Sequence, residues 1–270
     1  METVSCTYPK ISIVTVAYNC REVIERTILS VVHQDYDNFE YVVIDGGSND
    51  GTVNIIRQYE QYMAFWSSER DRGIYDAMNK SLAHVTGDWV IFMNAGDTFA
   101  ADDVLTQVFV PNRWENVGVV YGDINQFYEG MGSFVRRYNG MKASEVPLNI
   151  CHQACFTRSE VLNRYGFDLT FRICADADSF LRMSKEGIVF EYVPVVVANF
   201  DATDGCSSVR FVEFFKERCQ LEGTAEGTAA WKMGFAKAMT KNLIYRLIPK
   251  KLYVKCQYMR LRRKNKYQGL

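Results

Sequence analysis

The first hundred residues alternate short apolar runs with longer stretches in which apolar residues recur at helical spacing. The run at 11–18, ISIVTVAY, is rich in β-branched residues and continuous in apolarity, which is typical of a strand covered on both faces. Similar runs at 41–45, 64–66 and 89–93 predict three further strands. Because helical patterns separate them, the region predicts a parallel sheet with helices on both faces. The helical segments are expected at 19–32, 53–62 and 74–84.

Polar residues end three of these strands. Tyr18 and Asn19 follow the first strand, Asp45 ends the second, and Asp97 closes the turn after the fourth. Ligands of parallel sheets gather beyond the carboxyl ends of the strands, so this edge is where the sequence predicts chemistry. Asn19 also stands where it can cap the helix that follows.

The pattern changes in the second half of the chain. Residues 119–122 and 127–138 are typical of strands or a hairpin, with glycines in the turn. Helices are expected at 157–165 and 176–185, and 186–200 supplies a further strand.

A short segment at 221–230 contains a small EGTA duplication and is predicted to be a linker. It separates a domain at 1–220 from a tail at 231–270. Apolar residues recur in the tail every four positions, which predicts an amphipathic helix that Pro249 stops. These apolar positions are Trp231, Phe235, Met239, Leu243 and Leu247.

The net charge of −1 hides an asymmetry along the chain. The tail holds 12 basic residues and no acid, whereas the other 230 residues carry 19 basic and 32 acidic residues. A basic amphipathic helix suits an anionic lipid surface, which attracts each Lys or Arg by about 1 kcal/mol. A solvated tail is the alternative. Nucleic acid is not expected as a partner, because the body is acidic and no nucleic-acid-binding module is recognisable.

The amino-terminal region predicts neither export nor a membrane span, because its apolar run of eight residues is too short for either. Eight cysteines are scattered without the spacing of a disulfide scaffold, so reduced thiols in the cytoplasm are expected. Zinc is not expected at Cys151 and Cys155, since no second pair completes a tetrahedral site.

The loop after the second strand, DGGSNDGT, brings three glycines next to Asp45. A glycine turn with Asp50 at a helix start is one interpretation, and a ligand-binding loop is the other. The glycine spacing is not that of a dinucleotide fingerprint, and no P-loop lysine motif occurs, so a Rossmann dehydrogenase is disfavoured.

Six motifs together carry a more specific signal. They resemble, in this order, the motifs of glycosyltransferase family 2, over residues 9–212. The resemblance implies the GT-A fold, an α/β fold with three α/β/α layers and a mostly parallel nucleotide-binding sheet, followed here by the basic helical tail. It also implies a nucleotide-sugar donor. The motifs are VTVAYN, VVIDGGSNDGT, SERDRGIYDAMNK, GDWVIFMNAGD, HQACF and ADADSFLRM.

The resemblance implies donor-binding roles for two of these motifs. Asp45 matches the family's acid that contacts the nucleotide base, and the segment DRGIYDAMN matches one that lines the same pocket. The alternative for that segment is an ordinary amphipathic helix after a loop. The donor-binding candidates are Tyr18, Asn19, Asp45, Gly47, Ser48, Asp71, Asp76 and Asn79.

The motif NAGD stands where the family has its metal-binding acids, and Asp97 matches the last of them. Mg²⁺ or Mn²⁺ held there would bridge the donor phosphates and neutralise the departing diphosphate. Asn94 and Gly96 replace the other acids, so the donor phosphates must supply more of the ligands. The alternative makes Asp97 the cap of a helix that starts near Thr98.

Sugar transfer to an alcohol also needs a base. Asp176 aligns with the family's base, with Asp178 close by, and a single base implies inversion without a covalent intermediate. Helix capping is the alternative for both acids. His152 and Gln153 match an HQ pair near the acceptor or phosphate side, and Arg182, which follows the base helix, is a further candidate.

These features predict an enzyme that adds a single sugar, because the Q-x-x-R-W motif and spanning helices of processive synthases are missing. The acceptor is expected to be a glycan hydroxyl, lipid-linked by analogy with surface polysaccharide synthesis on the inner face of the membrane. A catalytically inactive nucleotide-sugar binding protein is the alternative, given the depleted acid cluster. A nucleotidyltransferase would need a glycine-rich basic phosphate loop, which the first strand lacks.

Overall fold

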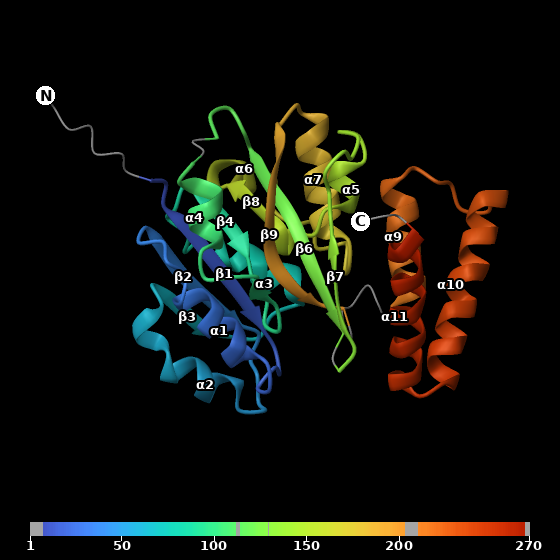
Figure 1. Cartoon of the computed structure of the whole chain (residues 1–270), viewed down its shortest axis with the longest axis horizontal. Coiled ribbons are helices and arrows are strands. Elements are labelled where there is room, and N and C mark those ends of the chain that lie inside the picture. The colour runs from blue at the N-terminus through green and yellow to red at the C-terminus, as the bar shows by residue number, and fades with distance from the viewer. Residues whose placement is uncertain (1–7, 112–113, 129, 203–209, 268–270) are drawn as a thin grey trace, which may run out of the picture. The chain divides into compact units, whose positions relative to one another are not determined.

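The computed structural model describes residues 8–111, 114–128, 130–202 and 210–267 (Figure 1). The chain divides into two compact units. One contains residues Met1–Asn125 and Val135–Phe200, and the other contains Gln126–Phe134 and Asp201–Leu270. The domain borders inferred from the sequence stay predictions.

The amino-terminal half forms the parallel part of the sheet, in the order β3-β2-β1-β4. Its strands carry their carboxyl ends to one edge, and buried β-branched residues fill β1 and β2. The strands are β1 (Ile11–Ala17), β2 (Phe39–Asp45), β3 (Phe65–Ser68) and β4 (Trp89–Phe92). The connecting helices are α1 (Ile24–Val32), α2 (Thr52–Gln58), the 3₁₀ turn η1 (Glu60–Tyr62) and α3 (Ile74–Ser81).

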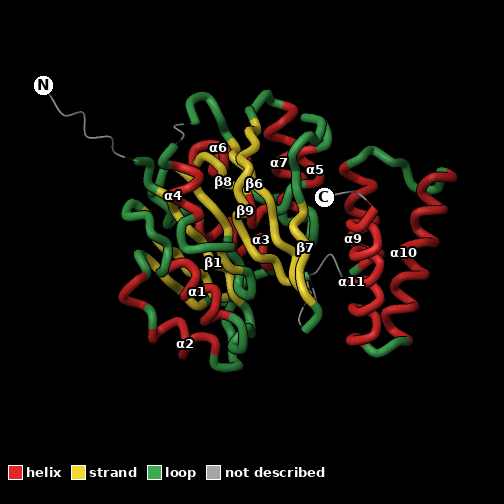
Figure 2. Tube along the Cα trace, viewed as in Figure 1, coloured by secondary structure: helices red, strands yellow, loops and turns green. Residues whose placement is uncertain are grey.

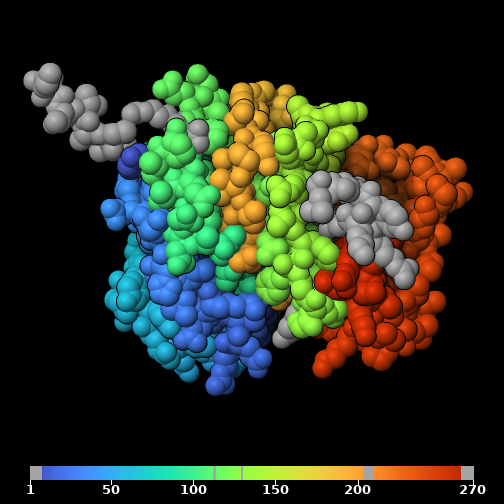
Figure 3. Space-filling model, viewed as in Figure 1, coloured from blue at the N-terminus to red at the C-terminus, as the bar shows by residue number. Residues whose placement is uncertain are grey.

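The sheet continues beyond β4 in the order β8-β6-β9-β5, and β7 pairs with β6 (Figure 2). The pairs β4–β8, β8–β6 and β9–β5 are antiparallel. These strands are β5 (Thr98–Phe99), β6 (Val119–Tyr128), β7 (Gly132–Arg136), β8 (Cys155–Arg158) and β9 (Phe190–Asp201). Side chains of β6 and β9 reach the surface on the face that Figure 3 shows. The helices of this part are α4 (Val104–Phe109), α5 (Val146–Asn149), η2 (His152–Ala154), α6 (Ser159–Tyr165) and α7 (Ala175–Lys185).

Helices cover both faces of the parallel strands. Trp89 of β4 lies against Phe109 of α4, with ring centroids 5.7 Å apart. Phe92, three positions further along β4, points to the opposite face and lies 5.4 Å from Phe167. Phe167 in turn stacks on Tyr75 of α3 at 5.6 Å. The predicted three-layer α/β/α arrangement is therefore confirmed.

The second unit contains three helices among its described residues, α9 (Phe211–Leu221), α10 (Ala229–Leu247) and α11 (Lys250–Tyr267). One aromatic cluster joins all three, because Phe211, Tyr245 and Tyr253 lie with ring centroids 5.1 to 5.9 Å apart. Gly234 lets α10 approach Phe215 of α9 closely, since an added Cβ would lie 2.4 Å from that ring. None of the described helices is long and apolar enough to cross a bilayer.

Some local predictions are wrong. Asn19 does not cap the next helix, because α1 begins only at Ile24 and Asn19 holds a neighbouring loop instead. The helix expected at 157–165 begins only at Ser159, because Thr157 and Arg158 belong to β8, which pairs with β6 and β4. Pro249 ends α10 as predicted, but α11 starts directly after it. The sequence pattern does not predict α4 or α9, whereas α11 lies in the tail that was predicted to be helical.

Candidate active site

The loops after β1 and β2 are tied together at the carboxyl edge of the sheet. The backbone N–H of Asn19 donates to Ser48 Oγ at 2.7 Å, and Asn49 N–H donates to Asn19 Oδ1 at 3.0 Å. Asn19 adopts a left-handed conformation with φ 47°, which asparagine tolerates. Cys20 N–H reaches Thr52 Oγ1 at 2.9 Å. The candidate donor residues of these two loops thus form one surface.

Asp45 organises the second loop from its centre. Its carboxylate is fully buried and accepts hydrogen bonds from Gly47 N–H, from the N–H and hydroxyl of Ser48 and from the Ser68 hydroxyl, at 2.5 to 3.0 Å. These bonds fix the positive-φ turn at Gly47. Contact of Asp45 with a nucleotide base stays a prediction, and it requires some of these bonds to be exchanged.

Two further donor candidates border the same loop. Asp71 lies so close to Gly46 that a Cβ there would come within 2.3 Å of Asp71 Oδ2, so a side chain at Gly46 would have to displace that carboxylate. Asp71 Oδ1 also accepts from Gly73 N–H at 2.8 Å. Tyr18 remains 64% exposed at the end of β1, which leaves an aromatic face open to a ligand.

Asp76 and Asn79 of α3 have structural partners. Arg72 donates to Asp76 with its backbone and its guanidinium at 2.7 to 3.2 Å, and these bonds lower the pKa of the carboxyl. Asn79 exchanges two hydrogen bonds with the backbone of Phe167, at 2.8 and 2.9 Å. Their contact with a nucleotide stays a prediction.

Asp97 lies in the tight turn between β4 and β5. The turn places Gly96 at φ 106° and closes with Asp97 N–H donating to Asn94 O at 2.9 Å. The Asp97 carboxylate is buried, and Gln153 Nε2 donates to its Oδ2 at 3.0 Å. Helix capping does not explain Asp97, because Thr98–Phe99 is strand β5, which pairs with β9.

His152, the neighbour of Gln153, reaches the second acid. Its Nδ1 lies 2.9 Å from Asp176 Oδ2, and its Nε2 lies 2.8 Å from the amide nitrogen of Asn94. With the amide nitrogen as donor, Nε2 accepts and the Nδ1–H donates to the carboxylate. The adjacent residues His152 and Gln153 of η2 therefore each bind one of the two acids. The four side chains form a continuous row of polar groups that runs from Asp97 to Asp176.

Asp176 sits in the first turn of α7 with donors on both oxygens. Besides His152, Ala177 N–H donates to Oδ1 at 2.9 Å, and the Tyr75 hydroxyl lies 3.1 Å from the same atom. Burial opposes ionisation of Asp176, but the hydrogen bonds from His152 and the other donors outweigh it and lower its pKa. The side chain keeps 19% exposure, so an acceptor hydroxyl has a route to it.

Capping does not explain Asp176, since α7 starts at Ala175 after Cys174, and no side chain caps it. Asp178 faces another way, because Arg182 Nε donates to it at 2.8 Å. Arg182 also donates to the carbonyls of Tyr165 and Gly166, which fixes the end of α6. These contacts give Asp178 and Arg182 a structural role, and an acceptor role for Arg182 stays a prediction.

Sequence reasoning missed two residues of the site. Asn94 stands opposite His152, and Tyr75 supports Asp176 from α3. Both residues lie inside recognisable motifs, NAGD and DRGIYDAMN, and membership of these motifs is the sequence signal that could have identified them. Their hydrogen-bond partners lie 58 and 101 residues away along the chain, and no local sequence pattern predicts contacts over such separations.

The described residues fit a divalent cation only in part. They contain no group of three or more His, Cys, Asp or Glu able to hold a metal. The β4–β5 turn does offer two hard oxygen donors of the kind Mg²⁺ and Mn²⁺ prefer, the Asp97 carboxylate and Asn94 Oδ1. Asn94 Oδ1 is buried and has no hydrogen-bond partner among the described residues. Phosphate oxygens and water would have to complete the coordination.

Comparisons with known proteins agree with this fold. Mannosyltransferase PcManGT from Pyrobaculum calidifontis, solved with GDP-Man and Mn²⁺, matches with a TM-score of 0.65 at 20% identity, over 94% of this chain and 81% of that one. TarS of S. aureus with UDP-GlcNAc matches with a TM-score of 0.66 at 17% identity, over 85% and 71%. The chain therefore has the GT-A fold.

The sequence comparisons narrow this to a family. The Glycosyl transferase family 2 profile matches residues 12–188. A PGL/p-HBAD biosynthesis glycosyltransferase of Mycobacterium bovis is 32% identical over 223 residues, which cover 79% of this chain and 85% of the relative. The chain belongs to glycosyltransferase family 2.

Proposed function

We propose that this glycosyltransferase moves one sugar from a nucleotide-diphosphate donor to a hydroxyl of a glycan acceptor, with inversion at the anomeric carbon. The observation that carries the proposal is the link between the two acids: Gln153 holds Asp97 and His152 holds Asp176. A leaving-group site and a base site thus share one framework, as direct displacement requires.

The step follows from the contacts of Asp176. Both its oxygens accept hydrogen bonds, but Oδ2 takes only the one from His152 among the bonds described. As the acceptor oxygen bonds to the anomeric carbon, its proton passes to Asp176, and the bond from that carbon to the diphosphate breaks with its electrons. Attack opposite the leaving group inverts the configuration, so the chain needs no nucleophile of its own.

Mg²⁺ or Mn²⁺, when bound beside the donor, would neutralise the charge on the leaving diphosphate. Asp97 and Asn94 are the residues that would hold it. Among the solved structures with this fold, the PcManGT complex includes Mn²⁺.

The donor would lie over the joined loops of β1 and β2. Asn19, Gly47 and Ser48 supply polar groups there, Asp71 borders them, and Tyr18 offers an aromatic face for the base. Asp45 is the internal anchor of this loop. UDP-sugars are the first donors to test, since TarS was solved with UDP-GlcNAc, and GDP-mannose is the second.

The acceptor would be a membrane-carried glycan in surface polysaccharide synthesis, and a putative teichuronic acid biosynthesis glycosyltransferase of Bacillus subtilis, 33% identical over 37% of this chain, supports this proposal. The tail supports a position at the inner face of the membrane, because α10 exposes Leu243 and Leu247 by 56% and 73% beside its basic residues.

A nucleotide-sugar binding protein without catalysis is the second candidate, because the turn carries a single acid where the family has several. Incubation with UDP- and GDP-sugars, Mn²⁺ and a panel of glycan acceptors separates the two. The proposal expects release of nucleoside diphosphate that increases with a suitable acceptor. Donor binding without any release across the panel would contradict the transferase.

A further inference from the structure

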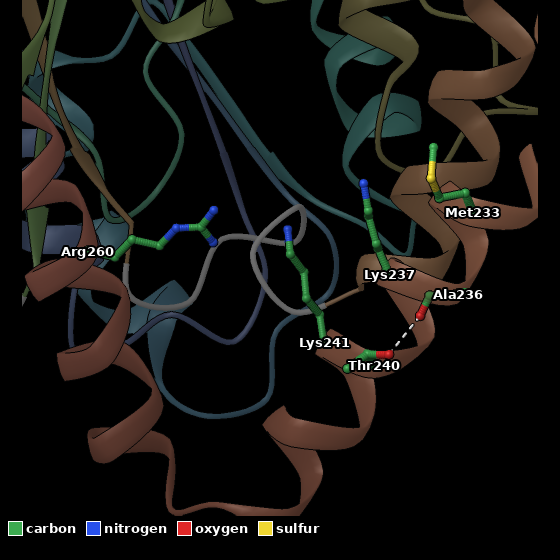
Figure 4. A pocket seen from close by; sticks show the side chains of 6 residues that line it. All are labelled: Met233, Ala236, Lys237, Thr240, Lys241 and Arg260. Carbon is green, nitrogen blue, oxygen red and sulfur yellow. Dashed lines mark hydrogen bonds between the residues drawn. The ribbon is translucent and has the colours of Figure 1, made fainter. Parts of the chain in front are cut away.

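A cavity of about 640 Å³ lies between α10 and α11 of the second unit. Its lining combines three cations with apolar and small residues: Met233, Ala236, Lys237, Thr240, Lys241 and Arg260. Figure 4 shows Lys237 and Lys241 on one helix and Arg260 on the other, with their side chains reaching into the space between. The volume is in the range of small-molecule sites.

No acidic side chain among the described residues forms an ion pair with the three cations of this cavity. Lys237 and Lys241 lie one helical turn apart, where like charges repel, and Arg260 adds a third charge from the opposite helix. Residues 231–270 contain no Asp or Glu. Thr240 donates its hydroxyl to the carbonyl of Ala236 in its own helix, so the cations are the cavity's main donors.

We propose that this α10–α11 cation site binds the phosphate or diphosphate group of an anionic ligand. A guanidinium donates two parallel hydrogen bonds to phosphate oxygens, and two ammonium groups add point charges around the same group. Met233, 60% exposed, gives one wall an apolar surface that suits the carbon chain next to a lipid phosphate. The site is separate from Asp97 and Asp176, and it does not depend on the proposed sugar transfer.

A specific site differs measurably from general attraction between a basic tail and an anionic surface. General attraction depends on the number of charges, whereas the site depends on three particular ones. The test compares a cavity variant, Lys237→Gln/Lys241→Gln/Arg260→Gln, with a control variant, Lys232→Gln/Lys251→Gln/Lys255→Gln. Both remove three positive charges from exposed positions of α10 and α11. Circular dichroism melts establish that both variants fold.

Two probes distinguish the source of the phosphate. Flotation uses phosphatidylcholine vesicles that contain phosphatidic acid or phosphatidylglycerol at equal surface charge. Calorimetry uses inorganic pyrophosphate with EDTA, so that any signal from the donor site is the same in both variants. UDP binding of each variant is also measured, as a separate check that the nucleotide-sugar site is unchanged.

The site predicts that the cavity variant binds one probe roughly tenfold more weakly than the control variant does, because both variants lose the same general attraction of three charges. A selective loss on phosphatidic acid vesicles identifies a lipid phosphate, and a selective loss for pyrophosphate alone identifies a soluble one. Equal losses by the two variants with both probes, or no loss in either, would overturn the site.

Discussion

His152 is the residue that sets the ionisation of Asp176. Asp176 is a partly buried acid, and burial alone would raise its pKa, but the hydrogen bonds from His152 and the other donors bring the pKa below its ordinary value. An acid with a lowered pKa is ionised at every pH above that value. The proposed base is therefore ready to accept a proton throughout the neutral range.

Replacing His152 by Phe should shift this balance. Burial would then be opposed by fewer donors, the pKa of Asp176 should rise, and the acid limb of kcat against pH should move to higher pH. Measuring donor turnover as a function of pH for wild type and His152→Phe gives the position of the acid limb in each protein. An acid limb at the same pH in both proteins would contradict the role of His152.

Asp97 should couple the binding of the metal to the binding of the nucleotide. Since the described residues supply one carboxylate at the turn, Mn²⁺ alone should bind weakly, and UDP with Mn²⁺ should bind at least roughly tenfold more tightly than UDP alone. Asp97→Asn should remove this gain. Calorimetry with and without Mn²⁺ measures it, and the exposed acid variant Asp102→Asn is the control. A full gain in Asp97→Asn would place the metal elsewhere.

At the scale of elements, Glu40 of β2 joins three segments of the sheet. It accepts hydrogen bonds from Lys10 Nζ and Ser12 Oγ at 2.6 Å and from Thr86 N–H at 2.5 Å. Burial opposes its ionisation, yet these bonds lower its pKa to about 2. A carboxylate held this firmly keeps the start of β1 beside the turn that leads into β4.

The lowered pKa makes stability depend on pH in a defined direction. The ionised Glu40 carboxylate contributes on the order of 3 kcal/mol to the free energy of unfolding. This contribution is present above the pKa of Glu40 in the unfolded chain, near 4.5, and is lost as the pH falls toward 2. Glu40→Gln should thus be strongly destabilised at pH 7, and its deficit against wild type should shrink at pH 3. Urea unfolding measures both, with the exposed Glu60→Gln as control. A deficit unchanged between the two pH values would refute the assignment.

The sequence predicts an element well when the residue pattern that defines the element lies within the element itself. The strands at 11–18 and 89–93 were readable because burial on both faces requires a continuous apolar run. Residues Cys155–Arg158 were not, since four residues carry too little periodicity and their strand character comes from β6 and β4. The acids of the site were found by motif, whereas the bridge through His152 and Gln153 is a property of the folded chain alone.

At the scale of the whole molecule, the charge asymmetry of the sequence coincides with the second unit. Its basic helices α10 and α11 expose large apolar side chains such as Met239, Leu243, Leu247 and Leu252. Side chains of this size are usually buried in a monomeric protein, so an apolar partner surface is expected here. An anionic membrane supplies both the apolar and the charged complement.

Leu243→Gln/Leu247→Gln should therefore reduce the fraction of protein bound to anionic vesicles roughly tenfold or more, because each buried leucine contributes about 1.5 kcal/mol or more. Vesicle flotation measures the bound fraction, and Val189→Gln, an exposed apolar position outside the tail, is the control. Equal binding by the leucine variant and wild type would refute a membrane contact through this face.

The proposed sugar transfer depends on Asp176 as the base of the reaction. The most direct measurement compares turnover and donor affinity of Asp176→Asn with those of Asp178→Asn, whose acid lies two positions away but pairs with Arg182. We expect Asp176→Asn to lose about a hundredfold to ten-thousandfold in turnover while donor affinity stays within a few fold, and Asp178→Asn to retain turnover. Near wild-type turnover in Asp176→Asn would contradict this role of Asp176.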